Sequence, residues 1–492
     1  MDAQHSKPFR LGGQWRTGLG ADDVITSIDP ADGSVAGVVT RARPKDVDDA
    51  VTIAWDAFRT KPWRKLRLDQ RASTLYEIGR RLAAERETLA RLQMRDCGKP
   101  WKECLNMVDV AAGNFRYYAA VCETWQNEMT PARGDYFSMA LAEPFGVVAA
   151  ITPWNSPILM ESQKVAPALA AGNAIVLKPS EETPQLSIEL ARICSEAGLP
   201  EGLMTVLPGF GEDVGSALVN HPGVRMVSFT GGTLTGRTIA AAAGRRLIPV
   251  GLELGGKSPH IVFEDADLDK AVAGVASGIF GSAGQSCVAG SRLFVQKSIF
   301  ERFMAELVAY TRMIRIGLPD DPATQMGPVI SRAHRDKVAA YVDLAREEGG
   351  RVLVGGERAD SGALKHGWFY QPTVIEGLSN RARVCQEEIF GPVLVALPFN
   401  DEADVIEQGN DTVFGLAAGI WTRDYARAWR VARELEAGSV WINTYKQSHI
   451  ATPFGGFKDS GIGREKGLHG LRLFSQVKSI YWGLHDKPLG IG

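Results

Sequence analysis

A single cysteine surrounded by very small residues is the first candidate for chemistry in this sequence. Cys287 lies in the stretch GSAGQSCVAG (281–290), where glycine, alanine and serine leave almost no side-chain bulk around the sulfur. A thiolate is a strong nucleophile at neutral pH, and an uncrowded sulfur lets a bulky planar ligand approach it. The alternative is structural, because a lone cysteine often packs as a small hydrophobic residue in a tight loop.

Two more polar residues could cooperate with such a sulfur. Glu253 lies in LELGGKSP (252–259), after an apolar run and before two glycines, where a carboxyl group can have a raised pKa and act as a general base. Asn155 lies in ITPWNSP (151–157), where prolines stiffen the loop, so its amide could donate to a developing oxyanion. Each could instead be a capping glutamate or a turn asparagine.

A glycine-rich stretch, FTGGTLTG (229–236), follows an apolar run and opens a helical pattern. Backbone N–H groups at such a turn, together with the helix dipole, favour a phosphate group. The pattern Gly231, Gly236, Arg237, Thr238 differs from a P-loop only by arginine in place of lysine. A nucleotide triphosphatase is therefore one alternative, and a plain turn between strand and helix is another.

The elements that must position these residues alternate in type. Short apolar runs predict strands, and amphipathic stretches ending at glycine predict helices: strands at 145–151, 173–179, 203–209 and 224–232, and helices at 161–172, 183–198 and 235–244. This alternation predicts an α/β fold with a parallel, doubly wound sheet. A second α/β domain is expected from about residue 256, and YFSMALAEPFG (136–146) alternates like an edge strand of a projecting hairpin.

Bulk properties exclude several classes of protein. The chain has 492 residues, 45% hydrophobic and 23% charged, with net charge −2, which predicts two or three globular domains and no nucleic-acid partner. We find no apolar run of about 18 residues for a membrane span and no secretory signal, so a cytoplasmic location is expected. None of the six cysteines forms a CxxC pair, so no metal site is predicted.

Seven stretches together resemble the signatures of the NAD(P)-dependent aldehyde dehydrogenase superfamily, in the family's order: PWNSP, KPSEETP, FTGGTLTG, LELGGKSP, GQSCVAG, EEIFGPV and PFGGFKDSGIGRE. The resemblance covers essentially the whole chain. It implies two doubly wound α/β domains, a Rossmann-like cofactor domain (1–122 and 145–255) and a catalytic domain (256–446). A small β-hairpin oligomerisation extension (123–144 and 470–492) completes the expected architecture.

The resemblance also implies roles for the candidate residues. Cys287 resembles the nucleophile that attacks the aldehyde carbon, and Asn155 with the Cys287 backbone N–H resembles the oxyanion hole. Glu253 resembles the base that activates water against the resulting thioester, so a free carboxylic acid is the expected product. Lys178 is assigned to the catalytic group and to the cofactor site.

NAD is the cofactor that the resemblance implies. Glu181 matches a position that accepts hydrogen bonds from the ribose hydroxyls and would repel the 2′-phosphate of NADP. Gly232 departs from the serine that many relatives have there. The expected cofactor contacts are Ile151, Thr152, Pro153, Trp154, Lys178, Ser180, Glu181, Gly211, Phe229, Thr230, Gly231, Gly232, Thr233, Gly236, Glu253, Leu254, Gly255, Cys287, Glu388 and Phe390.

The expected substrate site departs further from relatives that act on simple aldehydes, because polar residues replace aromatic ones. Its members are Asn155, Gln163, Ser286, Val288, Lys446, Ser448 and Phe454. A polar site disfavours an alkyl aldehyde, since polar groups would be left unpaired. We therefore expect a polar aldehyde or semialdehyde, with Lys446 or His449 to hold an anionic group. We also expect a homodimer or homotetramer that binds neither nucleic acid nor membrane.

Alternatives from other classes remain at this point. A P-loop nucleotide triphosphatase leaves Cys287 and Glu253 unexplained. A non-catalytic dinucleotide-binding protein on the same fold should have lost the nucleophile, the base or the amide donor, and all three are present. An acyltransferase that uses the cysteine would need a histidine partner, and no adjacent histidine supplies one.

Overall fold

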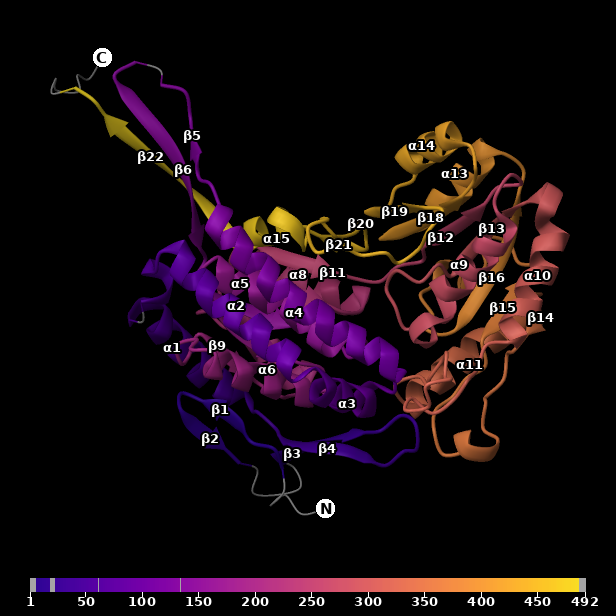
Figure 1. Cartoon of the computed structure of the whole chain (residues 1–492), viewed down its shortest axis with the longest axis horizontal. Helices are drawn as coiled ribbons and strands as arrows, with labels where there is room; N and C mark the ends of the chain where they lie inside the picture. Colours follow the sequence, from indigo (N-terminus) through magenta and orange to yellow (C-terminus); the bar gives the residue numbers. More distant parts are fainter. Residues whose placement is uncertain (1–5, 18–22, 61, 133, 486–492) are drawn as a thin grey trace.

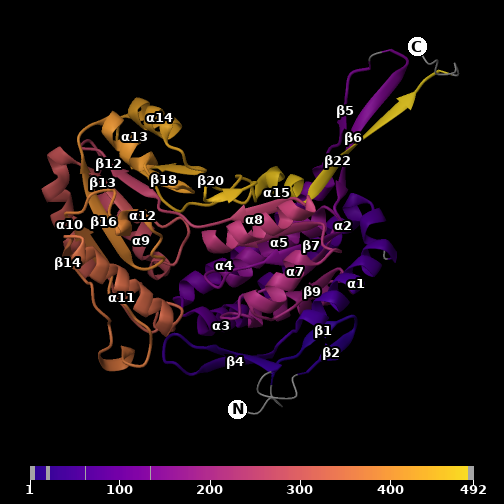
Figure 2. The ribbon, with the colours of Figure 1, turned by 180° about the vertical axis from the view of Figure 1, so that it is seen from behind.

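Two open, largely parallel sheets organise the chain (Figures 1 and 2). The computed structural model describes residues 6–17, 23–60, 62–132 and 134–485. The first sheet has six strands in the order β21-β11-β10-β7-β8-β9, all parallel except β21 at one edge. Its strands are β7 (Val147–Ile151), β8 (Ala174–Lys178), β9 (Met204–Val206), β10 (Met226–Thr230), β11 (Val250–Glu253) and β21 (Gly461–Ile462).

The first sheet is doubly wound. The chain runs outward from β7 through β8 to β9, returns to β10 on the other side of β7, and continues to β11. Strand order therefore reverses between β7 and β10, and a crevice outside the carboxyl ends of strands at such a point is the usual place for a ligand in this architecture. The connecting helices include α5 (Pro157–Ala170), α6 (Gln185–Glu196), α7 (Ser216–Asn220) and α8 (Thr233–Arg246).

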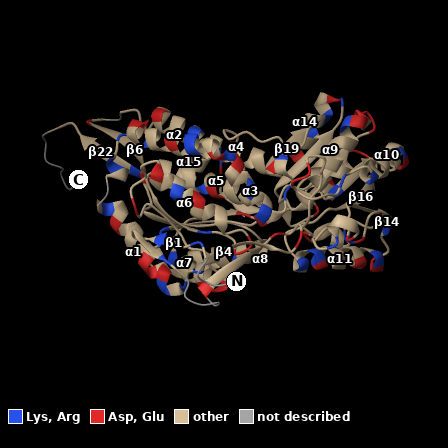
Figure 3. Cartoon of the chain, turned by 60° about the horizontal axis from the view of Figure 1, so that its bottom comes forward, with Lys and Arg blue, Asp and Glu red and all other residues tan. Residues whose placement is uncertain are grey.

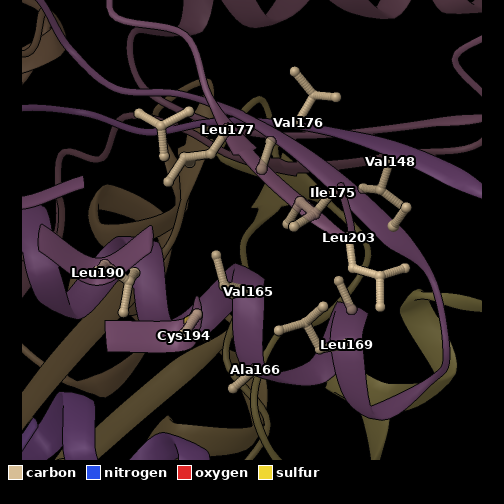
Figure 4. Packing of buried hydrophobic residues seen from close by; sticks show 14 of the residues in the cluster. Val148, Val165, Ala166, Leu169, Ile175, Val176, Leu177, Leu190, Cys194 and Leu203 are labelled. Atoms are coloured by element: carbon tan, nitrogen blue, oxygen red, sulfur yellow. The ribbon is translucent and has the colours of Figure 1, made fainter. Parts of the chain in front are cut away.

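Packing explains why these strands read as continuous apolar runs. Every residue of β7 and β8 is buried, because helices cover both faces of the sheet. Figure 4 shows part of this core, where Val148, Ile175 and Leu177 of the sheet lie near α5 and α6. The helices contribute Val165, Ala166, Leu169, Leu190 and Cys194.

The second sheet has seven strands in the order β14-β15-β16-β13-β12-β18-β19. They are β12 (Pro259–Val262), β13 (Arg292–Gln296), β14 (Arg351–Val354), β15 (Thr373–Glu376), β16 (Val393–Phe399), β18 (Ala417–Trp421) and β19 (Ser439–Ile442). Its helices are α9 (Leu268–Phe280), α10 (Phe300–Arg312), α11 (Arg332–Glu347), α12 (Arg383–Gln386), α13 (Glu402–Asn410) and α14 (Tyr425–Glu434). The predicted α/β class and the second α/β unit are confirmed.

The N-terminal part supplies helices and two small antiparallel sheets. Its helices are α1 (Pro44–Thr60), α2 (Leu68–Ala84), α3 (Arg86–Cys97) and α4 (Trp101–Thr124). The small sheets pair β1 (Phe9–Leu11) with β2 (Gln14–Arg16), and β3 (Val24–Ile28) with β4 (Val35–Thr40). Near the C-terminus, β17 (Phe414–Gly415) pairs with β20 (Phe457–Lys458), and α15 (Gly467–Leu473) follows.

A projecting arm is built from β5 (Glu128–Met129), β6 (Tyr136–Pro144) and β22 (Ser475–Gly483) (Figure 1). β6 pairs along its whole length with β22, and β5 pairs with its other side. The prediction that 136–146 forms an edge strand is therefore wrong, because β6 is the central strand. Its main partner comes from the far end of the chain, which a local alternation pattern cannot reveal.

Both signs of charge are interspersed over the outer helices, as along α11 in Figure 3, consistent with a net charge near zero. Among the described residues, no helix has the length and apolar character needed to cross a membrane. The expected domain ranges remain a proposal, with the boundary placed between β11 and β12; their ends at 1–5 and 486–492 lie outside the described residues.

Candidate active site

Cys287 lies in a loop that follows α9, at the junction of the two sheets. Two of the glycines near Cys287 are required because other parts of the chain pack closely against them. A side-chain carbon at Gly284, which has φ +71°, would overlap the carbonyl oxygen of Gly391, and one at Gly290 would lie 2.6 Å from Nδ1 of His260. At Gly281 the only neighbour within 4 Å would be Nζ of Lys446. The interpretation that the glycines leave room for a ligand therefore does not explain Gly284 and Gly290.

Asn155 is fixed against this loop. Its side-chain Nδ2 donates to the carbonyl oxygen of Gln285 at 3.0 Å, and Asn155 itself is buried at the start of α5. The backbone N–H of Cys287 donates to no acceptor among the described residues. The side-chain amide of Asn155 is thus held against the loop that carries the sulfur and its free backbone N–H, which is the arrangement needed to bind an oxyanion.

Glu253 ends β11 with a buried carboxylate that has no hydrogen-bond partner within the described part of the chain. Burial raises the pKa of Glu253 well above its usual value, and the nearby Glu465 carboxylate raises it further. Lys164, Arg464 and Lys466 act in the opposite direction. An unpaired buried carboxyl group that is readily protonated is suited to exchange protons with a substrate or water.

The sulfur and Glu253 are close enough to influence one another. Burial raises the pKa of the Cys287 thiol to about 12, and the carboxylates of Glu253 and Glu388 contribute. The segment after Glu253 also contacts the cysteine loop directly, because a side-chain carbon at Gly256 would overlap the carbonyl oxygen of Cys287. The fold therefore gathers Cys287, Asn155 and Glu253, which are far apart in the sequence, around one place.

The expected cofactor residues line the carboxyl ends of adjacent strands. Strand register places Ile151 of β7 opposite Lys178 of β8 and Phe229 of β10, and places Thr230 opposite Glu253. The hydroxyl groups of Thr152 and Thr230 are buried without partners among the described residues. Orphaned polar groups at the topological switch point fit a bound dinucleotide, which would supply the missing hydrogen bonds.

The turn after β10 is open where a phosphate would approach. Gly232 caps the N-terminus of α8 without a side chain, and no atom of the described residues outside its chain neighbours and own helix would lie within 4 Å of a carbon added there. Gly236 packs against Leu254, and Oγ1 of Thr233 accepts from the N–H of Gly255 at 3.2 Å. This seats the helix on the loop that follows Glu253.

Arg237 does not act as a P-loop lysine would. Its guanidinium pairs with Asp459 at 2.5 Å, and its side chain is 61% exposed. Arg237, which a P-loop would need to bind the triphosphate, is therefore paired with Asp459 at the surface. This argues against the nucleotide triphosphatase alternative.

The other expected cofactor contacts surround the same edge. Nζ of Lys178 donates to Glu181 at 3.0 Å, and the Gly256 N–H donates to Glu388 at 2.9 Å. The rings of Trp154 and Phe390 meet edge to face at 5.3 Å, with Phe390 at φ +62°. The remaining members are Pro153, which precedes Trp154; Ser180, whose hydroxyl accepts from the Glu182 N–H; Gly211, which begins a helical turn at 211–215; and Gly231, whose N–H donates to the Glu253 carbonyl oxygen at 3.1 Å.

The expected substrate residues differ in how their side chains are engaged. Gln163 is buried and donates to Glu465 at 2.5 Å, so its amide is already used within the protein. Lys446, Ser286 and Val288 are half-buried on or beside the cysteine loop. Ser448 accepts from Nζ of Lys466 at 2.7 Å, and that ammonium lies 5.1 Å from the centre of the Phe454 ring.

Several residues of the site were missed from the sequence. Glu465 accepts from Lys164 at 2.5 Å in a fully buried ion pair, and Tyr445 donates to the carbonyl oxygen of Val288 at 2.9 Å. Lys466 lies beside Glu253 and Cys287. Glu465 is the last residue of the motif PFGGFKDSGIGRE, and Lys466 follows it, so the motif could have indicated both. No pattern in the sequence around Lys164 indicates a role in the site.

Comparisons with known proteins agree on one family. A model of the aldehyde dehydrogenase family matches residues 15–480. A betaine aldehyde dehydrogenase from Mesorhizobium japonicum is 44% identical over 454 residues, which is 92% of each chain. A solved betaine aldehyde dehydrogenase from Staphylococcus aureus in complex with NAD+ is 37% identical with a TM-score of 0.96, covering 99% of this chain and 97% of that one. An aldehyde dehydrogenase from Bacillus cereus in complex with NAD+ is 39% identical with a TM-score of 0.95, covering 98% of each chain.

Proposed function

Because the chain belongs to the aldehyde dehydrogenase family, we propose that it oxidises a polar aldehyde to the carboxylic acid with NAD as cofactor. The observation that carries the proposal is the convergence of three groups. Asn155 is hydrogen-bonded to the loop of Cys287, and Glu253 lies beside that loop without a hydrogen-bond partner among the described residues.

Cys287 initiates the reaction in this proposal. Its sulfur bonds to the aldehyde carbon, and the carbonyl oxygen becomes an oxyanion that the Asn155 amide and the Cys287 N–H stabilise. Removal of one such donor typically costs a rate factor of about 100 to 1,000. Because burial raises the thiol pKa to about 12, the thiolate is a minor form at neutral pH, so transfer of the thiol proton to water precedes the attack and is part of the barrier.

Glu253 completes the turnover. NAD, when bound, supplies the acceptor for the hydride that leaves the thiohemiacetal carbon. The product of that oxidation is a thioester on Cys287. The ionised Glu253 carboxylate removes a proton from water, the water oxygen attacks the thioester carbon, and the carboxylic acid leaves as the sulfur is freed.

Several residues support NAD as the cofactor. Glu181, held by Lys178 at 3.0 Å, presents a carboxylate beside the strand end where the ribose is expected, and a 2′-phosphate there would be repelled. The orphaned hydroxyl groups of Thr152 and Thr230 lie along the same edge. Both solved relatives described above contain NAD+.

Betaine aldehyde is a second candidate substrate. A relative that is 44% identical over 92% of this chain is named for it. It is also polar, so the polar surroundings of Cys287 do not by themselves reject it. Betaine aldehyde carries a positive charge, whereas a semialdehyde with a carboxylate carries a negative one, so the two candidate substrates would place opposite charges beside the sulfur.

We also propose that the arm made of β5, β6 and β22 mediates assembly into a dimer or tetramer. Met129, Val477, Tyr481 and Trp482 are at least 60% exposed on it, which is unusual for large hydrophobic side chains in a monomer. A cytoplasmic location is supported by the cysteines, all six of which are free.

A direct assay tests the proposed function. NADH formation is followed by its near-ultraviolet absorbance with a panel of aldehydes, and carboxylic acid is identified as the product. Cys287→Ala should abolish NADH formation. Cys194→Ala, a matched change of a cysteine buried in the α6 core, should retain it. Activity that survives loss of Cys287 would reject the proposal.

A further inference from the structure

Two lysines beside Cys287 lack a carboxylate partner. Lys446 makes no hydrogen bond or ion pair with any described residue, although it is only half-exposed. Lys466 donates to the hydroxyl of Ser448 at 2.7 Å and lies over the Phe454 ring, but pairs with no acidic side chain among the described residues. Enclosed ammonium groups normally find a counter-charge, so this arrangement requires an explanation.

Both lysines belong to the surroundings of the reactive sulfur. Lys446 follows Tyr445, which donates to the carbonyl oxygen of Val288, and its Nζ borders Gly281 at the start of the cysteine loop. Lys466 follows Glu465, which lies beside Glu253. Lys446 opposes the rise in the pKa of the Cys287 thiol, and the Cys287 sulfur is among the groups that influence the pKa of Lys466.

The neighbouring carboxylates are already compensated. Glu103 lies near Lys446, but its oxygens accept from the Ser282 N–H at 3.2 Å and hydroxyl at 2.6 Å, and Nζ of Lys99 lies 3.7 Å away. Glu465 is occupied by Lys164 and Gln163. Glu253 is predominantly protonated over a wider pH range than an ordinary glutamate because its pKa is raised.

Lys446 and Lys466 therefore have no ion-paired carboxylate among the described residues, beside a sulfur on which Glu253 and Glu388 also act. Burial lowers the pKa of Lys446 to about 8, with Glu103 opposing the shift, so this ammonium still carries its charge at neutral pH. His449, the other cation expected from the sequence, is exposed, and its Nδ1 accepts from the Ala451 N–H. His449 is therefore not enclosed beside the cysteine loop as Lys446 is.

We propose that Lys446 and Lys466 form a cationic site that binds the anionic end of the substrate, so that the preferred aldehydes carry a carboxylate and quaternary ammonium aldehydes are disfavoured. This inference rests on the proposed function and specifies its substrate class. A carboxylate offers an acceptor to each ammonium group, whereas a trimethylammonium group offers none and adds like-charge repulsion. The chain thus differs in substrate charge from what the names of its betaine aldehyde dehydrogenase relatives suggest.

The test compares three aldehydes with NAD. They are succinic semialdehyde, its neutral methyl ester, and betaine aldehyde. The wild-type kcat/KM should be at least about tenfold higher for the anion than for the ester, and lowest for betaine aldehyde. Lys446→Met should reduce the anion-to-ester ratio about tenfold, and Lys446→Glu should raise the relative rate with betaine aldehyde.

Controls distinguish a wrong substrate preference from a wrong assignment of the reaction. Lys270→Met, a loss of charge at a side chain that is 76% exposed on α9, should leave the ratio unchanged. A wild-type preference for betaine aldehyde, or an unchanged ratio in Lys446→Met, overturns the inference while the proposed oxidation stands. Absence of NADH with every aldehyde overturns the proposed function, and the inference with it.

A second measurement covers the case in which a lysine variant does not fold. Succinate, the product of this oxidation, should inhibit the wild-type enzyme competitively against succinic semialdehyde, and monomethyl succinate, in which a neutral ester replaces the second carboxylate, should inhibit much less. The inhibition by succinate should weaken as ionic strength rises, because screening acts on the charge pair. Equal inhibition by both compounds contradicts a cationic site.

Discussion

The amide nitrogen of Asn155 lies 3.0 Å from the carbonyl oxygen of Gln285, two positions before Cys287 in the sequence. This bond ties the loop before α5, in the first sheet's domain, to the cysteine loop that leads into the second. It uses one N–H of the amide and leaves the other for a ligand. The oxyanion site is therefore assembled across the junction of the two sheets.

Asn155→Ala should lower kcat by a factor of about 100 to 1,000, because a donor to the oxyanion is lost. KM should change much less, since the amide acts mainly in the transition state. Steady-state NADH formation measures both constants. Asn220→Ala, a change at an exposed asparagine at the end of α7, serves as the matched control. An equal loss in both variants would contradict the assignment.

The pH dependence of turnover should reflect the raised pKa of Glu253. Water activation requires the carboxylate form, so a raised pKa moves the onset of thioester hydrolysis from the acid range toward neutral pH. The hydrolysis rate should therefore increase with pH through the pKa of Glu253 in the folded protein. Acyl-enzyme decay after rapid mixing measures this rate directly.

Glu253→Gln should remove that rise in hydrolysis rate and slow hydrolysis about 100-fold or more, since general base catalysis typically contributes about 100- to 10,000-fold. A wild-type hydrolysis rate that is independent of pH from the acid range upward would contradict a role for this carboxyl group.

The α/β alternation could be predicted because strand and helix patterns are local, and buried parallel strands read as apolar runs. The motifs also indicated Cys287, Asn155 and Glu253. By contrast, the Lys164–Glu465 pair joins residues 301 positions apart, and the β6–β22 pairing joins the middle of the chain to its end. Such contacts depend on tertiary packing, so no spacing within the sequence reveals them.

Lys164→Met should destabilise the protein strongly. Both members of the Lys164–Glu465 pair are almost completely buried, so loss of the ammonium leaves an uncompensated carboxylate in the interior. Breaking a buried pair from one side typically costs about 3 to 5 kcal/mol. Thermal and denaturant unfolding measure the loss.

The double variant Lys164→Met/Glu465→Gln, in which no charge remains unpaired, should recover part of that stability. If the single and double variants are equally unstable, the ion pair is not the cause of the loss.

The most direct test of the central claim is mass spectrometry of the Glu253→Gln enzyme mixed with NAD and aldehyde. If Cys287 forms the thioester and Glu253 promotes its hydrolysis, the enzyme should release a stoichiometric burst of NADH and retain one acyl group on the peptide that contains Cys287. Turnover at the wild-type rate without a covalent adduct, or an adduct on another residue, would contradict the account.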